Sequence, residues 1–333
     1  MPKRLPTVLV NLSIILTLAV VLLGGWTRVN DAGLSCPDWP GCYGEYVIPG
    51  TVEQQQSAQM RYPEYPMDIR KGWIEMVHRY FAGSLGVLIG CLALVAWRQP
   101  PKSGYPVMLS WLLFGFVILQ GLFGMWTVTL KLQPLIVVLH LLGGLITLSL
   151  LIRLRQRVAD WQQERVLQTQ IPRWWLRIAV ILLFGQIALG GWTSANYSRW
   201  VCSHWIICDT QGSVELDYVA GFTVWQPLGP NYQGGRLDHK ARAAIQISHR
   251  IGAVVVTIYL ASLLLFCILR HRLTVLMGIT GGVLLLQLLL GVLNVVLTPT
   301  WLPVAHLLGA CALLICLLQF YQMPLTLKEA PHA

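Results

Sequence analysis

Four of the eight histidines lie within long apolar segments, where an ionisable side chain is costly and marks a candidate functional site. Each lies about one turn inside its segment, so all four imidazoles are predicted at a similar depth. They are His78, His140, His249 and His306. Paired imidazoles on facing helices suit a haem iron, whereas zinc or copper would need further ligands nearby. The pattern favours two haem sites over four separate hydrogen-bonding histidines.

One carboxylate distinguishes the two predicted sites. Glu75 precedes His78 by three residues, so helical periodicity places both on one face, and Gln246 holds the matching position before His249. Glu75 is the predicted catalytic residue, which would transfer protons or stabilise developing positive charge. Alternatively, it only caps its helix or anchors Arg79. Under the first interpretation, the N-terminal site is the active one and the C-terminal site transfers electrons.

The residues around the histidines have predicted supporting roles. Arg79 and Arg250 directly follow two of them, and each guanidinium would either bind a haem propionate or extend to the lipid headgroups. Gln120 and Gln287 are predicted to form hydrogen bonds between helices. Six glycines are predicted to leave room for a flat ring: Gly83, Gly86, Gly143, Gly144, Gly252 and Gly309.

The composition predicts a membrane protein. Charged residues make up only 11% of the 333 residues, hydrophobic residues make up 55%, and the mean hydropathy is +0.60. Segments long enough to cross the hydrocarbon, about 20 residues each, lie at 7–27, 73–97, 106–130, 135–152, 174–194, 244–269, 273–298 and 301–321. We interpret the first as a retained span rather than a cleaved signal. The predicted fold class is an all-α integral membrane protein with eight transmembrane helices.

The positive charges predict the orientation. The formal net charge is +10, but basic residues concentrate in the short connections, with Arg153, Arg155 and Arg157 in one of them. By the positive-inside rule, these connections and both termini face the cytoplasm, and the long loops at 28–72 and 195–243 lie outside. The charge therefore predicts an orientation in a bacterial inner membrane, with periplasmic loops and membrane lipid as a partner, and not a nucleic-acid partner.

An internal repeat predicts two tandem bundles. LGGWTRVNDAGLSCPDWPGC at 23–42 and LGGWTSANYSRWVCSHWIIC at 189–208 align without a gap, and EMVHRYFAG at 75–83 matches QISHRIGA at 246–253. Each unit holds four helices, so the units are predicted as four-helix bundles related by a pseudo-two-fold axis along the membrane normal. The predicted domains are 1–155 and 173–333, with 156–172 as a cytoplasmic linker.

Four cysteines lie in the predicted outer loops. They form two pairs of equal spacing, and the oxidising compartment favours disulfides over half-complete metal sites. The predicted bridges are Cys36–Cys42 and Cys202–Cys208. The cysteines within the apolar spans are predicted packing residues.

The combination of GGWTRVNDAGLSCPDWPGCYG, EMVHR, SHR and AHLLG resembles the haem A synthase family, in its proteobacterial type, over nearly the whole chain. The resemblance implies oxidation of the C8 methyl group of haem O, through an alcohol, to the formyl group of haem A. It implies that His78 and His140 hold the substrate or product haem, and that His249 and His306 hold haem B. It further implies that Glu75 is essential, that Cys36 and Cys42 are a redox-active or structural pair, and that water supplies the oxygen.

Further partners are expected: haem O synthase, assembly factors of terminal oxidases and an unidentified electron acceptor. The alternative functions are a quinol-linked two-haem electron-transfer cytochrome, which would not need Glu75, and a transporter, which would not explain the histidines. The long loop at 208–242 has no assigned role. Its aromatic residues would lie at the membrane interface or cover the haem sites: Tyr218, Phe222, Trp225 and Tyr232.

Overall fold

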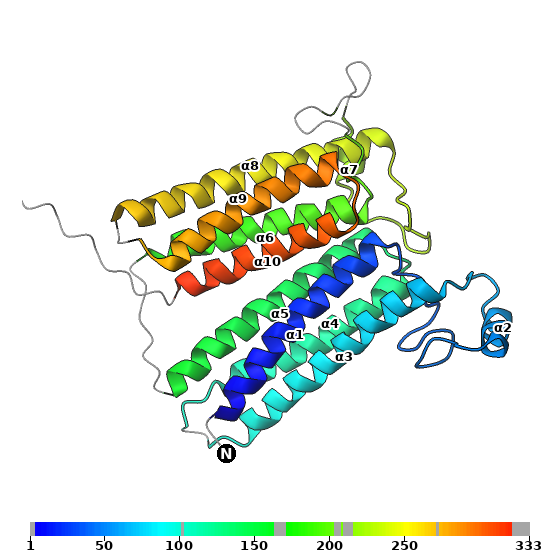
Figure 1. The fold of residues 1–333 in the computed structure, drawn as a ribbon, viewed down its shortest axis with the longest axis horizontal. Helices are drawn as coiled ribbons and strands as arrows, with labels where there is room; N and C mark the ends of the chain where they lie inside the picture. The colour runs from blue at the N-terminus through cyan, green and yellow to red at the C-terminus, as the bar shows by residue number, and fades with distance from the viewer. Residues whose placement is uncertain are drawn as a thin grey trace, which may run out of the picture.

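The structure, a computed structural model, describes residues 4–100, 103–162, 171–202, 208, 216–270 and 273–321. Within these ranges every regular element is a helix (Figure 1). Eight helices are long and apolar enough to cross a membrane: α1 (Arg4–Val29), α3 (Ile69–Trp97), α4 (Val107–Thr129), α5 (Pro134–Trp161), α6 (Arg173–Ala195), α8 (His239–Arg270), α9 (Val275–Val296) and α10 (Trp301–Phe320). Two shorter helices, α2 (Val52–Arg61) and α7 (Tyr218–Gly221), lie in the long loops. The all-helical membrane fold is thus confirmed.

Three helices extend beyond their apolar segments. α3 begins at Ile69, where the Asp68 side chain accepts a hydrogen bond from the Lys71 amide at 3.0 Å, and α8 begins at His239. His78 and His249 therefore lie deeper in their helices than one turn. α5 continues to Trp161, so the predicted linker at 156–172 begins as helix. Hydropathy locates the apolar run, whereas backbone hydrogen bonds extend the helix into polar surroundings.

The helices form two neighbouring sets (Figure 1). In the first set α1 contacts α3 and α5, while α4 contacts the same two helices; in the second set α6 and α9 both contact α8 and α10. The sets meet where α5 contacts α6 and α10, and where α1 contacts α10. Each set corresponds to one copy of the repeat, while the pseudo-two-fold relation stays a prediction.

The largest buried apolar cluster extends across both sets. It joins Leu145 and Leu148 of α5 to Leu183 of α6 and Leu314 of α10, all at most 3% exposed. The cysteines Cys267, Cys311 and Cys316 are buried and unbridged, as predicted for packing residues. Close packing between α5, α6 and α10 therefore holds the two sets together.

The repeated LGGWT segment ends α1 and α6 in the same way. After α1, the Asp31 and Ala32 amides donate to the carbonyls of Arg28 and Thr27, and after α6 the Tyr197 and Ser198 amides bond to Ser194 and Thr193. This pair of bonds is the Schellman motif, which needs a residue with positive φ. Asp31 and Tyr197 take that place, with φ of 49° and 55°. The repeated sequence thus ends both helices with the same C-terminal capping motif.

These two equivalent residues also bind each other. The Tyr197 hydroxyl donates to Asp31 Oδ1 at 2.6 Å, and Arg28 pairs with the same carboxylate at 3.3 Å. The Arg28 guanidinium lies 4.0 Å from the centre of the Tyr197 ring and donates to the Ser194 carbonyl. We call this group the α1–α6 clasp (Arg28, Asp31, Ser194, Tyr197). It joins the two sets at the ends of α1 and α6.

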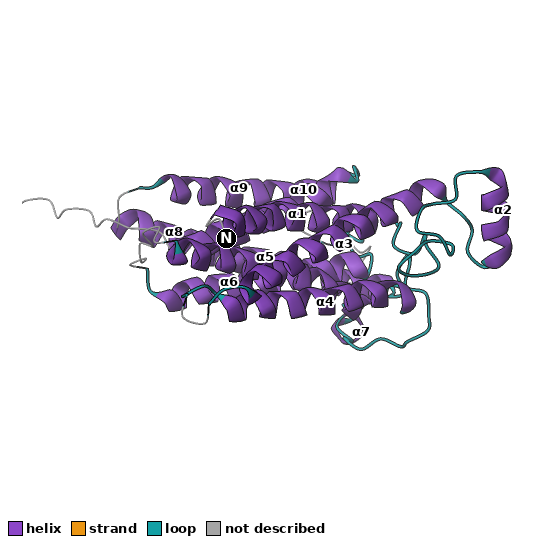
Figure 2. Cartoon of the chain, turned by 90° about the horizontal axis from the view of Figure 1, so that it is seen from below, coloured by secondary structure: helices purple, strands orange, loops and turns teal. Residues whose placement is uncertain are grey.

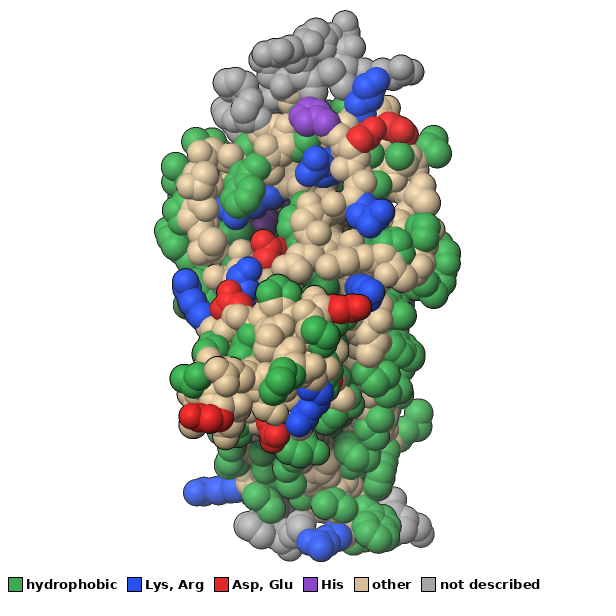
Figure 3. Space-filling view, turned by 90° about the vertical axis from the view of Figure 1, so that its right-hand side faces the viewer, with side chains coloured by type: hydrophobic (Ala, Val, Ile, Leu, Met, Phe, Trp, Pro, Cys, Tyr) green, Lys and Arg blue, Asp and Glu red, His purple; other side chains and the backbone are tan. Residues whose placement is uncertain are grey.

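The long loops lie at the same end of the molecule. Figure 2 shows α2 projecting beyond the helical sets and α7 folded against them, and Figure 3 looks onto this end, where charged side chains are scattered. Part of the second loop crosses between the sets: the Tyr232 amide donates to the Lys131 carbonyl at 3.0 Å, and Trp192 Nε1 donates to the Gly221 carbonyl at 2.8 Å. Tyr232 is buried and Phe222 packs against the apolar cluster that includes Trp192, whereas Trp225 is 65% exposed.

We predict that Tyr197→Phe destabilises the protein by about 1–2 kcal/mol, because it removes a hydrogen bond to a charged group. Thermal unfolding in detergent measures the loss. Tyr46→Phe removes a hydroxyl from a side chain that is 75% exposed, and it serves as the control. Equal unfolding temperatures for the two variants would contradict a stabilising clasp.

The clasp also predicts that the stability of the protein falls at alkaline pH. Burial and the Asp31 hydrogen bond raise the pKa of Tyr197, while the Arg28 charge opposes them. The neutral phenol therefore adds stability that is fully present below the ordinary pKa of about 10 and is lost as pH rises through the raised value. Unfolding temperatures between about pH 9 and 11 should fall more steeply for wild type than for Tyr197→Phe. Parallel slopes would exclude this contribution.

Candidate functional site

The predicted histidines lie in pairs within each helical set. His78 of α3 and His140 of α5 have ring centres 6.5 Å apart, with the rings nearly perpendicular. His249 of α8 and His306 of α10 are close enough to interact electrostatically. All four side chains are half-buried. With bonds of about 2 Å from metal to imidazole nitrogen, a 6.5 Å spacing suits one metal ion held between two rings.

Each histidine ring lies against a glycine of a neighbouring helix. A Cβ atom at Gly24, Gly124, Gly190 or Gly291 would lie 3.0, 3.3, 3.2 or 3.4 Å from the Cε1 atom of, respectively, His78, His140, His249 or His306. At three of these positions even a methyl group would crowd the ring. The glycines thus let a helix backbone approach each imidazole closely, in the same way in both sets.

The six glycines predicted to make room for a ring divide into different classes. Gly83 and Gly86 of α3 have nothing within 4 Å of a Cβ position. At Gly143, Gly252 and Gly309 the space is filled instead by glutamine side chains, and a Cβ at Gly144 would meet Val21 at 3.3 Å. Of these six, only Gly83 and Gly86 therefore have open space at the Cβ position.

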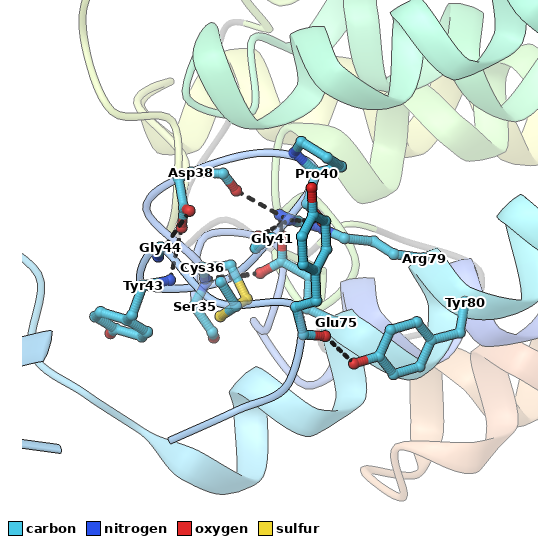
Figure 4. The surroundings of a disulfide bond; sticks show 12 residues. Ser35, Cys36, Asp38, Pro40, Gly41, Tyr43, Gly44, Glu75, Arg79 and Tyr80 are labelled. Atoms are coloured by element: carbon cyan, nitrogen blue, oxygen red, sulfur yellow. Dashed lines mark hydrogen bonds and ion pairs between the residues drawn. A yellow bond between two sulfur atoms is a disulfide. The ribbon is translucent and has the colours of Figure 1, made fainter. Parts of the chain in front are cut away.

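Glu75 is buried beneath the first long loop (Figure 4). It is 3% exposed, and its Oε2 atom accepts hydrogen bonds from the Ser35 and Cys36 amides, both at 3.0 Å. Its Oε1 atom pairs with Arg79, one helical turn further along α3. Both carboxylate oxygens thus have partners, and Glu75 anchors Arg79 as the alternative interpretation expected.

Arg79 completes the attachment of this loop. Its Nη1 atom donates to the Asp38 carbonyl at 2.9 Å, and also to the carbonyls of Pro40 and Gly41 (Figure 4). With Glu75, it holds both sides of the loop that the Cys36–Cys42 disulfide closes. We call this unit the Glu75–Arg79 anchor. In this structure the guanidinium faces protein carbonyls, so its predicted contact with a propionate stays a prediction.

The second set lacks the carboxylate of this anchor. Gln246 and Arg250 of α8 take the places of Glu75 and Arg79, and Gln246 is 4% exposed. The Cys202–Cys208 disulfide closes its loop as predicted, although the residues between the two cysteines lie outside the described part of the chain. Each loop therefore has its own disulfide, and the carboxylate of Glu75 has a neutral amide as its counterpart in the second set.

Glutamines near the histidines extend the predicted site. The amides of Gln120 and Gln287 bond to the carbonyls of His140 and His306, which confirms the predicted contacts between helices. A third, Gln186 of α6, lies 3.1 Å from His249 Nδ1 and was missed. Its signal was its place within an apolar helix, because a buried amide there usually needs a polar partner.

The donor set suits haem better than a bare ion. Among the described residues, no group of three or more histidine, cysteine, aspartate or glutamate side chains converges as a metal site. Two facing imidazoles leave the remaining positions around an iron to a macrocycle that brings its own nitrogens. The spacing of His78 and His140 thus fits a bound haem.

Comparisons with known proteins identify the family of the chain. A family model, COX15-CtaA, described as cytochrome oxidase assembly protein, matches residues 7–318. The chain is similar to "Heme A synthase" of Shewanella oneidensis, with 38% identity over 93% of this chain and 94% of the relative. It is also similar to proteins of that name from Caulobacter vibrioides, with 28% identity over 89% of each chain, and Allorhizobium ampelinum, with 25% identity over 74% and 69%.

We predict that Glu75→Ala destabilises the protein by about 3–5 kcal/mol, because it leaves the Arg79 charge buried without its carboxylate. The disulfide loop should then be cut faster by protease and its bridge reduced faster by dithiothreitol. Glu53→Ala, on the exposed helix α2 of the same loop, is the matched control. If the two variants were cleaved and reduced at the same rates, Glu75 would not anchor the loop.

Proposed function

Because the chain belongs to the COX15-CtaA family of cytochrome oxidase assembly proteins, we propose that it is a haem A synthase. In this proposal it oxidises the C8 methyl group of haem O, through a hydroxymethyl stage, to the formyl group of haem A. The observation that carries the proposal is the facing pair His78 and His140, whose 6.5 Å spacing suits a haem iron. The similar pair His249 and His306 accounts for a second haem.

The proposed reaction proceeds in two balanced steps. In the first, the methyl group and one water molecule give the alcohol and release two protons and two electrons. In the second, the alcohol gives the aldehyde and releases the same numbers again. Water is the proposed oxygen source, and an electron acceptor outside the chain must take up the electrons.

The N-terminal half is proposed to bind the substrate. His78 and His140 would hold the iron of haem O between α3 and α5, beside the open backbone at Gly83 and Gly86. Glu75 is the proposed catalytic residue, because a buried negative charge one turn from His78 would stabilise positive charge that develops on the substrate. Its bonds to the loop would hold that charge in place during the reaction.

The C-terminal half is proposed to bind the cofactor. His249 and His306 would hold haem B, which would accept electrons from the substrate site and pass them on. Gln246 in place of a carboxylate fits a site with no proton transfer. Arg79 and Arg250 are the proposed partners of the haem propionates, although Arg79 would first have to exchange its loop carbonyls for them.

The proposed location is the bacterial inner membrane, with both termini in the cytoplasm and the disulfide loops in the periplasm. The helices α2 and α7, which belong to the two long loops, lie at the same end of the membrane helices, as this orientation requires (Figure 1). Haem O synthase and oxidase assembly factors are proposed partners, since haem O and haem A would pass between such proteins and this one through the lipid.

The alternative is a quinol-linked two-haem electron-transfer cytochrome. It explains the two histidine pairs equally well, but it leaves the buried Glu75 in only one half without a purpose beyond holding the loop. A Glu75→Gln variant separates the two functions, because it preserves the shape of the side chain. The synthase predicts bound haem without conversion of haem O, whereas full conversion would remove Glu75 from the reaction.

Pigment extraction tests the proposal directly. Protein purified from cells that make haem O should release haem B together with haem O or haem A. His249→Ala should lose chiefly haem B, and His140→Ala should lose chiefly haem O and haem A. Protein that contained only haem B in both halves would favour the cytochrome.

A further inference from the structure

The second long loop contains an apolar stretch that includes helix α7, and we call it the loop segment (residues 218–228). No charged residue lies between Asp217 and Arg236. Large apolar side chains of the loop segment are between 46% and 84% exposed: Tyr218, Val219, Val224, Trp225 and Leu228. So many exposed apolar side chains in one short stretch indicate an interaction surface.

The other side of the loop segment is bound to the helices. The Gly221 carbonyl accepts a hydrogen bond from Trp192 Nε1 of α6 at 2.8 Å. A Cβ atom at Gly221 would lie only 2.8 Å from the carbonyl oxygen of Ala241 of α8, so the backbone of the segment packs directly on that helix. Phe222 packs against the apolar cluster that includes Trp192 and Ile245. The loop segment thus has one side on α6 and α8 and one side that faces away from them.

Gln226 fixes the far end of the loop segment. Its side chain is 5% exposed, and its Nε2 atom donates to Asn196 Oδ1 at 3.2 Å. Its carbonyl accepts a hydrogen bond from Gln133 Nε2 at 3.4 Å. Asn196 ends α6 and Gln133 precedes α5, so this end is attached where the two helical sets meet.

These attachments set the depth of the loop segment in the membrane. Trp192 lies one turn, about 5 Å, before the end of α6, and Ile245 lies in the second turn of α8. Both residues are at the outer ends of the apolar runs of their helices. The loop segment is therefore level with the boundary between hydrocarbon and headgroups. Figure 2 agrees, because α7 lies at the flank of the helices whereas α2 projects beyond their ends.

Lipid suits the outward side of the loop segment in its chemistry. Tyrosine and tryptophan are the residues enriched at membrane interfaces, because their rings combine an apolar body with a polar atom. The lack of charge favours contact with acyl chains, while an irregular backbone at this depth still reaches headgroups and water for its hydrogen bonds. A cover over the histidines would instead require Tyr218 and Trp225 to face the helices.

We propose that the loop segment is an interfacial anchor, whose outward side lies in the headgroup region of the adjacent membrane leaflet. Tyr218 and Trp225 then contact lipid, while Phe222 and Tyr232 contact protein. The anchor holds the outer ends of α5, α6 and α8 at a fixed depth. It depends only on the membrane fold and not on the haem chemistry.

A nitroxide spin label on Val219→Cys tests the anchor in the full-length protein, reconstituted in phosphatidylcholine vesicles. Cys91→Ala is the background, because the other unbridged cysteines are buried. Oxygen, which concentrates in hydrocarbon, should relax this label more strongly than a water-soluble nickel chelate does. Ser57→Cys, on the exposed surface of α2, is the matched control and should show the reverse order.

Trp225→Cys applies the same measurement near the other end of the loop segment and should also favour oxygen. Addition of phosphatidylglycerol should leave both results unchanged, because the segment has no basic residue to attract an anionic lipid. A preference for oxygen that appeared only with phosphatidylglycerol would contradict an apolar anchor.

Two further outcomes would overturn the anchor. If both labels behaved like the label on Ser57→Cys, the loop segment would face water. If neither oxygen nor the nickel chelate reached them, another protein surface would cover the segment in place of lipid. Either result would leave the proposed haem A synthase untouched, since pigment extraction tests that function separately.

Discussion

Polar side chains within the hydrocarbon must find their partners inside the chain, because no water is available there. The arrangement of the four imidazoles follows from this constraint. Each ring lies where a glycine lets a neighbouring helix come close, and three rings also meet an amide. The hydrophobic effect does not draw helices together in lipid, so close packing at small residues holds these crossings instead. The contacts that position the histidines are therefore also contacts that pack the helices together.

The two halves differ at the outer ends of their first histidine helices. Beside His78 a buried ion pair attaches the disulfide loop to α3, while beside His249 the matching side chain is a neutral amide. Buried charges are costly unless paired and hydrogen-bonded, and here Glu75 and Arg79 pair with each other and bond to five backbone groups. The carboxylate of Glu75 and its pairing with the following arginine therefore occur in one half, where the other half has a neutral amide.

The helices, the histidine sites and the disulfide pairs could be predicted from the sequence. Hydropathy, the cost of burying an ionisable group and the redox state of the compartment can each be judged from individual residues. The sequence predicted that Gln120 and Gln287 bond to another helix, but it did not identify their partners. The space for their amides depends on glycines of that other helix. The sequence also left the role of Glu75 open between catalysis and anchoring. The bonds from Ser35 and Cys36 arise about 40 residues away in the chain, and no local pattern indicates contacts at that distance.

The α1–α6 clasp bears on how the two halves came to differ. Equivalent positions that touch are the mark of an interface between two copies of one chain, and Asp31 touches Tyr197. In a dimer of identical repeats this crossing would hold either two carboxylates, which repel, or two tyrosine rings competing for one place. A donor facing an acceptor there requires two positions that mutate independently. Within one chain the two repeats carry different residues at this position, so the crossing holds an asymmetric hydrogen bond from Tyr197 to Asp31.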